Sequence, residues 1–322
     1  MQPVIKPVDR KLIQRELTAS KYIRTTRKGD NELYEVTYKD SPNIMQEIGR
    51  LREISFRLAG GGSGKDCDID QFDTDPVDFY RQLIVWDPHD KEILGGYRYI
   101  LCGGISPEKM ATSELFHFSD TFIRDYMPFT IELGRSFIQP NYQNINLKRK
   151  GLFALDNLWD GLGALMLKYS HYKYFFGKVT MYTSYNLRAR NTLLNFLHKY
   201  FGDPDCLVTP IEPIDYDSSN KYYQELFNGL EYHDAYKVLQ KEIKVNGELI
   251  PPLINSYMNL SPSMKVFGTA INPGFGNVEE TGILVKMEDI YPEKKERHLV
   301  PMQEALHAMA ARFRPKWWRK IL

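Results

Sequence analysis

The order of patterned segments between residues 32 and 201 limits the folds open to this chain more than any other feature. Residues 32–38 alternate as a strand, and a helical pattern begins after Ser41. Residues 82–86 and 93–102 follow as a hairpin, and residues 130–138 as a third strand of this group. A basic loop then leads to a helix at 152–172, an apolar strand at 178–183 and a helix at 187–201. This order predicts an α+β fold with a central, mostly antiparallel sheet flanked by helices.

The flanking regions are patterned less clearly. Residues 1–30 are basic, with one short amphipathic helix around Leu12, Ile13 and Leu17, and they are expected to form an N-terminal extension. Helices are predicted at 221–243 and 249–260, and strands at 266–272 and 282–287. We therefore expect one main domain over residues 31–290, followed by a basic and aromatic C-terminal extension over residues 291–322.

Composition and missing motifs exclude several classes of protein. The chain has 42 basic and 41 acidic residues, so its net charge does not favour nucleic acid. Its three cysteines form no CxxC pair, and no zinc or other metal site is expected. The P-loop, GxGxxG and GxSxG motifs are absent. There is no signal-peptide pattern and no run of 18 apolar residues, so a cytoplasmic location is expected.

The run Glu132-Leu133-Gly134-Arg135-Ser136 falls inside a predicted strand. Regular alternation would place Glu132, Gly134 and Ser136 on one face, and Leu133 and Arg135 on the other. A carboxylate and a guanidinium in mid-strand need a partner or a solvated cleft, and glycine there often marks a bulge or the approach of a ligand. The run is compatible with a functional site and also with a structural ion pair beside a bulge.

Other charged residues precede this run. Arg52 and Phe56 share one helix face, and Arg98 lies in the aromatic strand of the hairpin, where its fork suits a carboxylate or a phosphate. Asp70 and Asp73 belong to an acidic loop whose spacing does not fit the EF-hand pattern for calcium. Such a loop suits a cationic amine or the guanidinium of Arg52, and a solvated acidic loop is the alternative.

Taken together, these residues resemble the bacterial ornithine-lipid and glycine-lipid synthases, which are often labelled hemolysin-like. Those N-acyltransferases belong to the GCN5-related acetyltransferase (GNAT) superfamily and are related to acyl-homoserine-lactone synthases. The resemblance extends over roughly residues 40–290 and includes residues 155–161, 250–253 and 272–275. It is closest to the subgroup that makes N-acyl glycine. It implies a GNAT-like sheet whose middle strands splay apart near Gly134 and the strand of Lys178.

The implied activity is transfer of a long-chain (3-hydroxy)acyl group to the amine of a small amino acid, with glycine first among the candidates. Glu132 is the expected general base, directly or through water, and Arg135 and Ser136 complete the expected catalytic group. Backbone N–H groups at 134–136 are expected to stabilise the oxyanion. Arg98, ahead of Arg135 or Arg52, is expected to hold the acceptor carboxylate. The implied substrate-binding residues are Arg52, Phe56, Asp70, Asp73, Arg98 and Gly134.

The expected donor is a thioester, and no bound cofactor is expected. GNAT enzymes that use acetyl-CoA carry a glycine-rich turn before the central helix, whereas this chain has Lys148, Arg149, Lys150 and Gly151 there. Adjacent cations suit the acidic face of an acyl carrier protein and its phosphopantetheine, although acyl-CoA stays open as the donor. An aromatic segment at 116–129 is expected either to line the acyl channel or to be ordinary core.

Residues 312–322 carry five basic residues and two tryptophans, a composition suited to an anionic membrane surface. This extension predicts peripheral association with the inner face of the cytoplasmic membrane, unless the tryptophans pack on the fold. Two alternative functions remain open. One is synthesis of acyl-homoserine lactones, and the other is a non-enzymatic, hemolysin-like membrane-binding protein.

Overall fold

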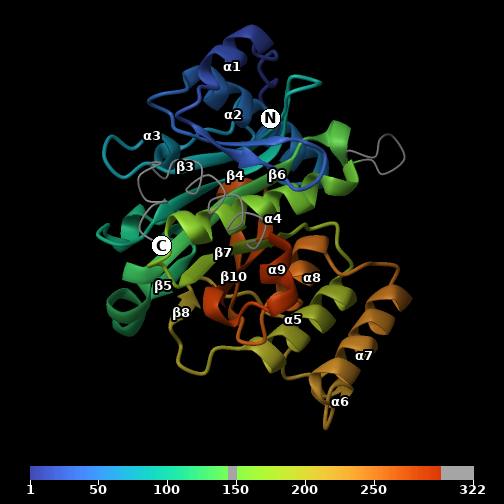
Figure 1. Cartoon of the computed structure of the whole chain (residues 1–322). Helices are drawn as coiled ribbons and strands as arrows, with labels where there is room; N and C mark the ends of the chain where they lie inside the picture. The colour runs from blue at the N-terminus through green and yellow to red at the C-terminus, as the bar shows by residue number, and fades with distance from the viewer. Residues whose placement is uncertain (144–150, 299–322) are drawn as a thin grey trace, which may run out of the picture.

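A computed structural model describes residues 1–143 and 151–298. The cations at 148–150 and the tail at 312–322 lie outside the described residues. An open eight-stranded sheet runs through the middle of the molecule (Figure 1). Its order is β1 (Tyr22–Thr25), β2 (Glu32–Val36), β3 (Arg81–Asp87), β4 (Glu92–Leu101), β6 (Thr130–Ile138), β7 (Tyr174–Met181), β10 (Val278–Lys286) and β9 (Lys265–Asn272). A small separate sheet joins β5 (Phe116–Phe118) to β8 (Val208–Pro210).

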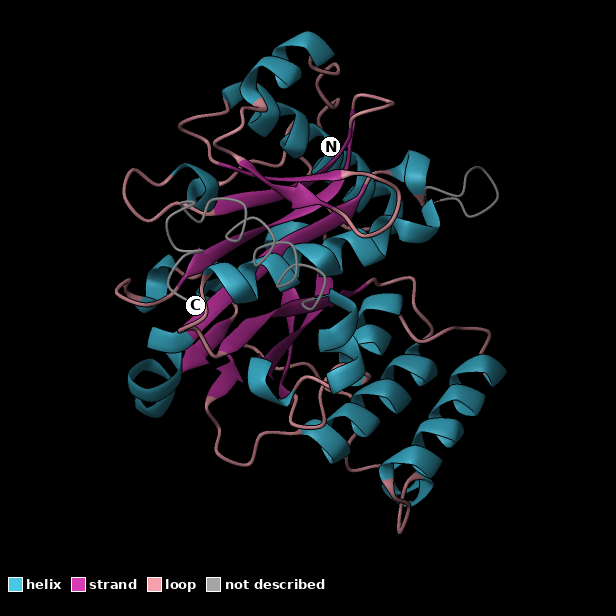
Figure 2. Cartoon of the chain, viewed as in Figure 1, coloured by secondary structure: helices cyan, strands magenta, loops and turns pink. Residues whose placement is uncertain are grey.

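Helices cover the sheet on both sides (Figure 2). Their bounds are α1 (Arg10–Glu16), α2 (Pro42–Ala59), α3 (Gln71–Thr74), α4 (Gly151–Lys168), α5 (Leu187–Phe201), α6 (Lys221–Leu226), α7 (Tyr232–Val245), α8 (Pro252–Met258) and α9 (Pro292–His298). Helices α4, α5, α7 and α8 share one apolar core with the sheet, while α1 and α2 pack in a separate core with the other face of β2, β3 and β4. The result is the predicted α+β architecture.

The central strands separate as the resemblance implied. Every neighbouring pair in the large sheet is antiparallel except β6 and β7, which are parallel. These two strands pair only from Thr130↔Tyr174 to Leu133↔Gly177. Beyond that point β6 continues to Ile138 and β7 to Met181 without pairing each other. The opening between them begins at Gly134 and Lys178, and we refer to it as the split.

Helix α2 starts where the sequence predicts, but a different residue caps its N-terminus. The Ser41 side chain makes no capping hydrogen bond. Instead the carboxylate of Glu16, at the end of α1, accepts from the backbone N–H groups of Asn43 at 3.1 Å and Ile44 at 2.9 Å. The helix ends at Gly60, whose φ of 99° is a left-handed conformation that suits glycine. The N-terminal thirty residues therefore contribute a cap for α2 as well as the edge strand β1.

Several predicted elements have different bounds. The helix predicted at 221–243 is two helices, α6 and α7, because the chain turns between them at Gly229, whose φ is 70°. The helix predicted at 249–260 is the shorter α8, which starts at Pro252. The strand predicted at 178–183 starts four residues earlier, at Tyr174. In each case tertiary packing or a turn glycine overrides a periodic pattern.

Candidate active site

A bulge in β6 shapes the edge of the split. Arg98 of β4 pairs with Gly134, whereas Gly96 pairs with Phe137, so β6 has one residue too many between these two pairs. Arg135 lies in this bulge and adopts a positive φ of 51°. The prediction that Arg135 faces away from Glu132 is therefore wrong, because regular alternation fails at a bulge. The side chain of Arg135 turns to the same acidic loop that binds Arg98.

Glu132 is a buried carboxylate, with only 1% of its surface exposed, and no arginine or lysine of the described residues lies within ion-pair distance of it. Its Oε2 accepts a hydrogen bond from the Tyr80 hydroxyl, and its Oε1 accepts one from the backbone N–H of Thr112 at 2.8 Å. The Tyr80 hydroxyl in turn accepts from the Ala111 N–H at 2.8 Å. Burial raises the pKa of Glu132, and these hydrogen bonds lower it again in part. The group is placed and tuned to take up a proton.

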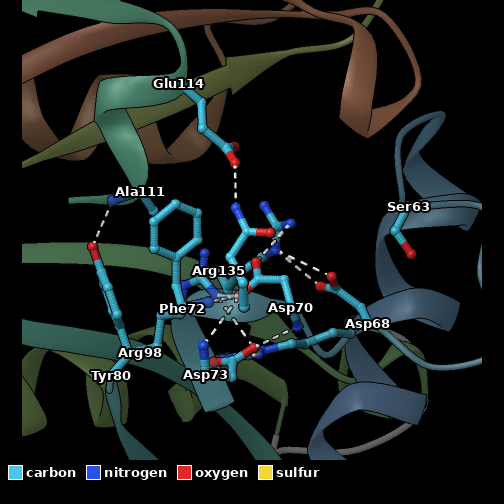
Figure 3. Close-up of polar contacts among 12 residues, drawn as sticks. Ser63, Asp68, Asp70, Phe72, Asp73, Tyr80, Arg98, Ala111, Glu114 and Arg135 are labelled. Carbon is cyan, nitrogen blue, oxygen red and sulfur yellow. Dashed lines mark hydrogen bonds and ion pairs between the residues drawn. The ribbon is translucent and has the colours of Figure 1, made fainter. Parts of the chain in front are cut away.

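Three arginines and three aspartates form a largely buried cluster, and Figure 3 shows Arg98 and Arg135 of it with Asp68, Asp70 and Asp73. Arg98 Nη1 binds Asp70 at 2.6 Å and Asp73 at 3.2 Å. The guanidinium of Arg98 also lies 4.8 Å from the ring centroid of Tyr80. Burial would raise the pKa of Asp70, but Arg98 and the other guanidinium groups hold it well below its usual range. Arg98 therefore already has two carboxylate partners.

The remaining members of the cluster hold the acidic loop against α2 and β6. Arg52 is fully buried and binds Asp73 at 3.2 Å, as the sequence allowed. Arg135 Nε binds Asp68 at 2.9 Å, and its guanidinium lies 4.3 Å from the ring centroid of Phe275. Within residues 1–143 and 151–298, no group of three or more histidine, cysteine, aspartate or glutamate side chains is arranged to hold a metal ion.

A polar cavity opens beside this cluster on the face of the sheet that carries Glu132. Its wall includes predicted site residues, namely Phe56, Arg98, Glu132, Gly134, Arg135 and Ser136. Arg52, Asp70 and Asp73 are not part of that wall and lie behind it. The structure thus brings six of the nine predicted catalytic and substrate-binding residues to one cavity, and it gives the other three of these nine a supporting place as ion-pair partners.

One buried polar atom of the cavity wall, Arg98 Nε, has no hydrogen-bond partner among the described residues. A Cβ at Gly134 would lie 3.6 Å from Arg98 Nε, so the missing side chain leaves open the space in front of that donor. Because buried polar groups in native proteins are nearly always paired, this donor suits a polar ligand or a water molecule in the cavity.

An apolar cavity lies on the other face of the split, under α4. Its wall includes Tyr97, Leu158, Trp159, Phe175 and Val285. Both cavities share the residues at the split itself: Leu133, Gly134, Arg135, Ser136, Lys178 and Leu253. The split therefore joins an apolar compartment on one side of the sheet to a polar compartment on the other.

A second apolar cavity continues from the first beneath α9. The two share Trp159, Leu162 and Phe175, so the indole of Trp159 belongs to the wall of both. The far end of the second cavity is bordered by Lys294, Lys295 and His298. The aromatic segment at 116–129 lines neither cavity in the described part of the chain. Its members Phe116 and Phe122 are packed in a core with Phe176, as the ordinary-core alternative for that segment predicted.

Sequence patterns missed an ion pair on the far side of the split. Lys178 of β7 binds Glu280 of β10 at 2.5 Å, and both residues line the polar cavity. Glu280 also accepts from Asn272 Nδ2 at 2.8 Å and Thr180 Oγ1 at 3.3 Å. Burial would raise the pKa of Glu280, but Lys178 and Asn272 lower it below its usual value. Nothing in the local sequence marks it, because its partners are a hundred residues apart.

Comparison with known proteins adds to this geometry. The family model of the acetyltransferase (GNAT) domain matches residues 51–149. A glycine Nα-acyltransferase of Phocaeicola vulgatus is 49% identical to this chain over 304 residues, which make up 93% of each protein. A glycine Nα-acyltransferase of Bacteroides thetaiotaomicron is 52% identical over 304 residues, 93% of this chain and 90% of that protein. Among the described helices, none has the length and apolar character that crossing a bilayer requires.

Proposed function

Since this chain belongs to the family of these glycine Nα-acyltransferases and is an amide-forming acyltransferase of the GNAT fold, we propose that its acceptor is glycine and its donor a long-chain acyl thioester. The donor group is a (3-hydroxy)acyl chain carried by acyl carrier protein, and the product is an N-acyl glycine for aminolipid synthesis. The observation that carries this proposal is the split, where an apolar and a polar cavity meet beside Glu132.

The proposed chemistry needs no covalent enzyme intermediate. Glycine enters the polar cavity as an ammonium, and Glu132 takes one proton from it, directly or through water. The neutral amine attacks the thioester carbonyl carbon, the C–N bond forms, and the C–S bond breaks. The sulfur leaves as a thiolate and takes up the second proton, which the nitrogen loses as the amide forms. The backbone N–H groups at 134–136 and the unpartnered Arg98 Nε are the donors proposed for the oxyanion.

The apolar cavity under α4 supports a long acyl chain. Each methylene moved from water into such a cavity contributes about 0.8 kcal/mol, so a long chain binds far more tightly than an acetyl group. The carrier-protein part of the proposal rests on the sequence alone, on Lys148, Arg149 and Lys150 before Gly151. Docking of an acidic carrier on these cations should weaken as salt increases, whereas acyl-CoA turnover should depend on salt much less.

The direct test is an acceptor panel with purified protein. Palmitoyl and 3-hydroxypalmitoyl carrier protein, or the matching CoA esters, are incubated with glycine, ornithine or S-adenosylmethionine, and products are identified by mass spectrometry. We expect N-acyl glycine to dominate. An acyl-homoserine lactone, an acyl-ornithine or no amide at all would contradict the proposed acceptor.

A matched variant tests the role of Glu132. Glu132→Gln keeps the shape of the side chain but cannot take up the proton, so turnover should fall by about 100-fold or more. Thermal unfolding shows that the variant is folded. Turnover close to that of the wild type would remove Glu132 from the mechanism, and membrane lysis by an inactive variant would favour the hemolysin-like alternative.

A further inference from the structure

The Lys178–Glu280 pair stands at the split without a role in the chemistry described so far. Lys178 lies at the first position of β7 beyond its pairing with β6, and thus across the split from Gly134. Its side chain is 11% exposed and belongs to the wall of both cavities. A lysine ammonium has three N–H donors, and Glu280 is the only carboxylate within ion-pair distance of it among the described residues.

The arginines around the polar cavity, unlike Lys178, belong to a cluster in which each cation is matched by an aspartate. Arg52, Arg98 and Arg135 are matched by Asp68, Asp70 and Asp73. Arg98 Nη1 is bound to two carboxylates, and Arg135 is bound to Asp68 and packed on Phe275. Nη1 of Arg98 and Nε of Arg135 are thus engaged by carboxylates of the protein itself. Lys178 has no partner other than Glu280 among the described residues, so its ammonium retains N–H donors for a ligand.

We propose that Lys178, held in place by Glu280, binds the carboxylate of the amino-acid acceptor and thereby selects α-amino acids over simple amines. This inference rests on the proposed function and assigns to Lys178 the task that sequence patterns gave to Arg98. Glu132 and Lys178 line one cavity from opposite strands of the split. An acceptor whose ammonium meets Glu132 places its carboxylate toward Lys178, so both charges of the zwitterion are matched.

The ion pair with Glu280 explains how the ammonium of Lys178 can stay charged and available to a ligand although it is largely buried. A lone ammonium at this depth is costly, while one bound to a saturated carboxylate is stable and still offers N–H groups to a ligand. Glu280 is thus a positioning residue, and Lys178 is the residue that touches the substrate.

The test compares glycine with glycinamide, which has the same amine but no carboxylate. In the wild type we expect a clear preference for glycine in kcat/KM. Lys178→Met should lower kcat/KM for glycine by about 10- to 100-fold, as expected for loss of a charge-assisted hydrogen bond, and should leave glycinamide nearly unchanged. Lys178→Arg should retain most of the preference. Lys286→Met, the same change on β10 outside both cavities, serves as the matched control.

A double variant controls for misfolding of the Lys178→Met protein. Lys178→Met with Glu280→Gln removes both charges together, so no uncompensated charge stays buried, and it should show the same loss specific to glycine. Equal losses for glycine and glycinamide, or a wild type that does not distinguish them, would overturn the inference. A wild type that acylates neither compound, but acylates another amine, would instead contradict the proposed function.

Discussion

At the scale of single residues, the proposed base and the arginines beside it have different kinds of partners. Glu132 is held by neutral donors, the Tyr80 hydroxyl and the Thr112 N–H, while the arginines nearby are occupied by aspartates. A direct ion pair would hold a carboxylate ionised but too weak a base to accept a proton from an ammonium. Burial with neutral hydrogen bonds gives a carboxylate whose pKa is raised. The local environment thus suits Glu132 to proton transfer.

Tyr80→Phe tests this tuning. Glu132 works as a base only when ionised, so activity is lost as pH falls through its pKa, which burial has raised. The Tyr80 hydroxyl lowers that pKa by donating to the carboxylate, so its removal should move the acid limb of kcat/KM to higher pH. The profile with glycine is compared with that of the wild type. An acid limb that stays in place, or moves to lower pH, would contradict the assignment.

At the scale of secondary-structure elements, features that depend on local sequence were predicted better than features that depend on strand pairing. Helix α5 has the predicted bounds because Asn186 caps it and Gly202 follows it. The run from Glu132 to Ser136 pointed to the cavity, since a carboxylate beside a strand glycine is unusual. The face of Arg135 was missed because a bulge reverses alternation. Lys178 and Glu280 were missed because only the pairing of β7 with β10 brings them together.

Helix α4 contributes Trp159 and Leu162 to the wall that the two apolar cavities share, together with Phe175 of β7. Trp159 has the largest of these three side chains. Trp159→Ala should join the cavities and shift donor preference toward longer acyl chains. Competition between myristoyl and stearoyl donors, followed by mass spectrometry of the N-acyl glycines, measures the shift. Trp159→Phe is the matched control and should change the ratio less. An unchanged ratio in the alanine variant would show that the chain runs elsewhere.

At the scale of the whole molecule, the apolar cavity under α4 and the polar cavity on the side of α2 lie on opposite faces of the sheet. The N-terminal residues are joined to the polar side, since Gln2 and Ile5 donate backbone hydrogen bonds to Gly64 and Asp66 of the loop after α2. The proposed product is amphiphilic, with its two parts formed on these two sides. Such a product suits release at a membrane surface.

Deletion of residues 312–322 tests membrane association. These residues hold five cations and two tryptophans, and clustered cations near anionic lipid contribute about 1 kcal/mol each. The full chain should sediment with phosphatidylglycerol vesicles at low salt, and the truncated chain should stay in the supernatant while retaining its turnover. Vesicles of phosphatidylcholine alone are the control. Unfolding of the truncated chain, or no sedimentation of the full chain, would show that the segment does not act as an anchor.

The split also determines how a finished molecule can leave. In the proposed binding mode the product extends through the split, with its acyl tail in the apolar cavity under α4 and its head group beside Glu132 in the polar cavity. It must slide out lengthwise, and a head larger than glycine would meet the rim formed by Arg135 and Lys178. If the product leaves on the polar side, its whole acyl tail has to pass through the split. The rate of exit should therefore fall with tail length, so that the longest products leave last and limit turnover.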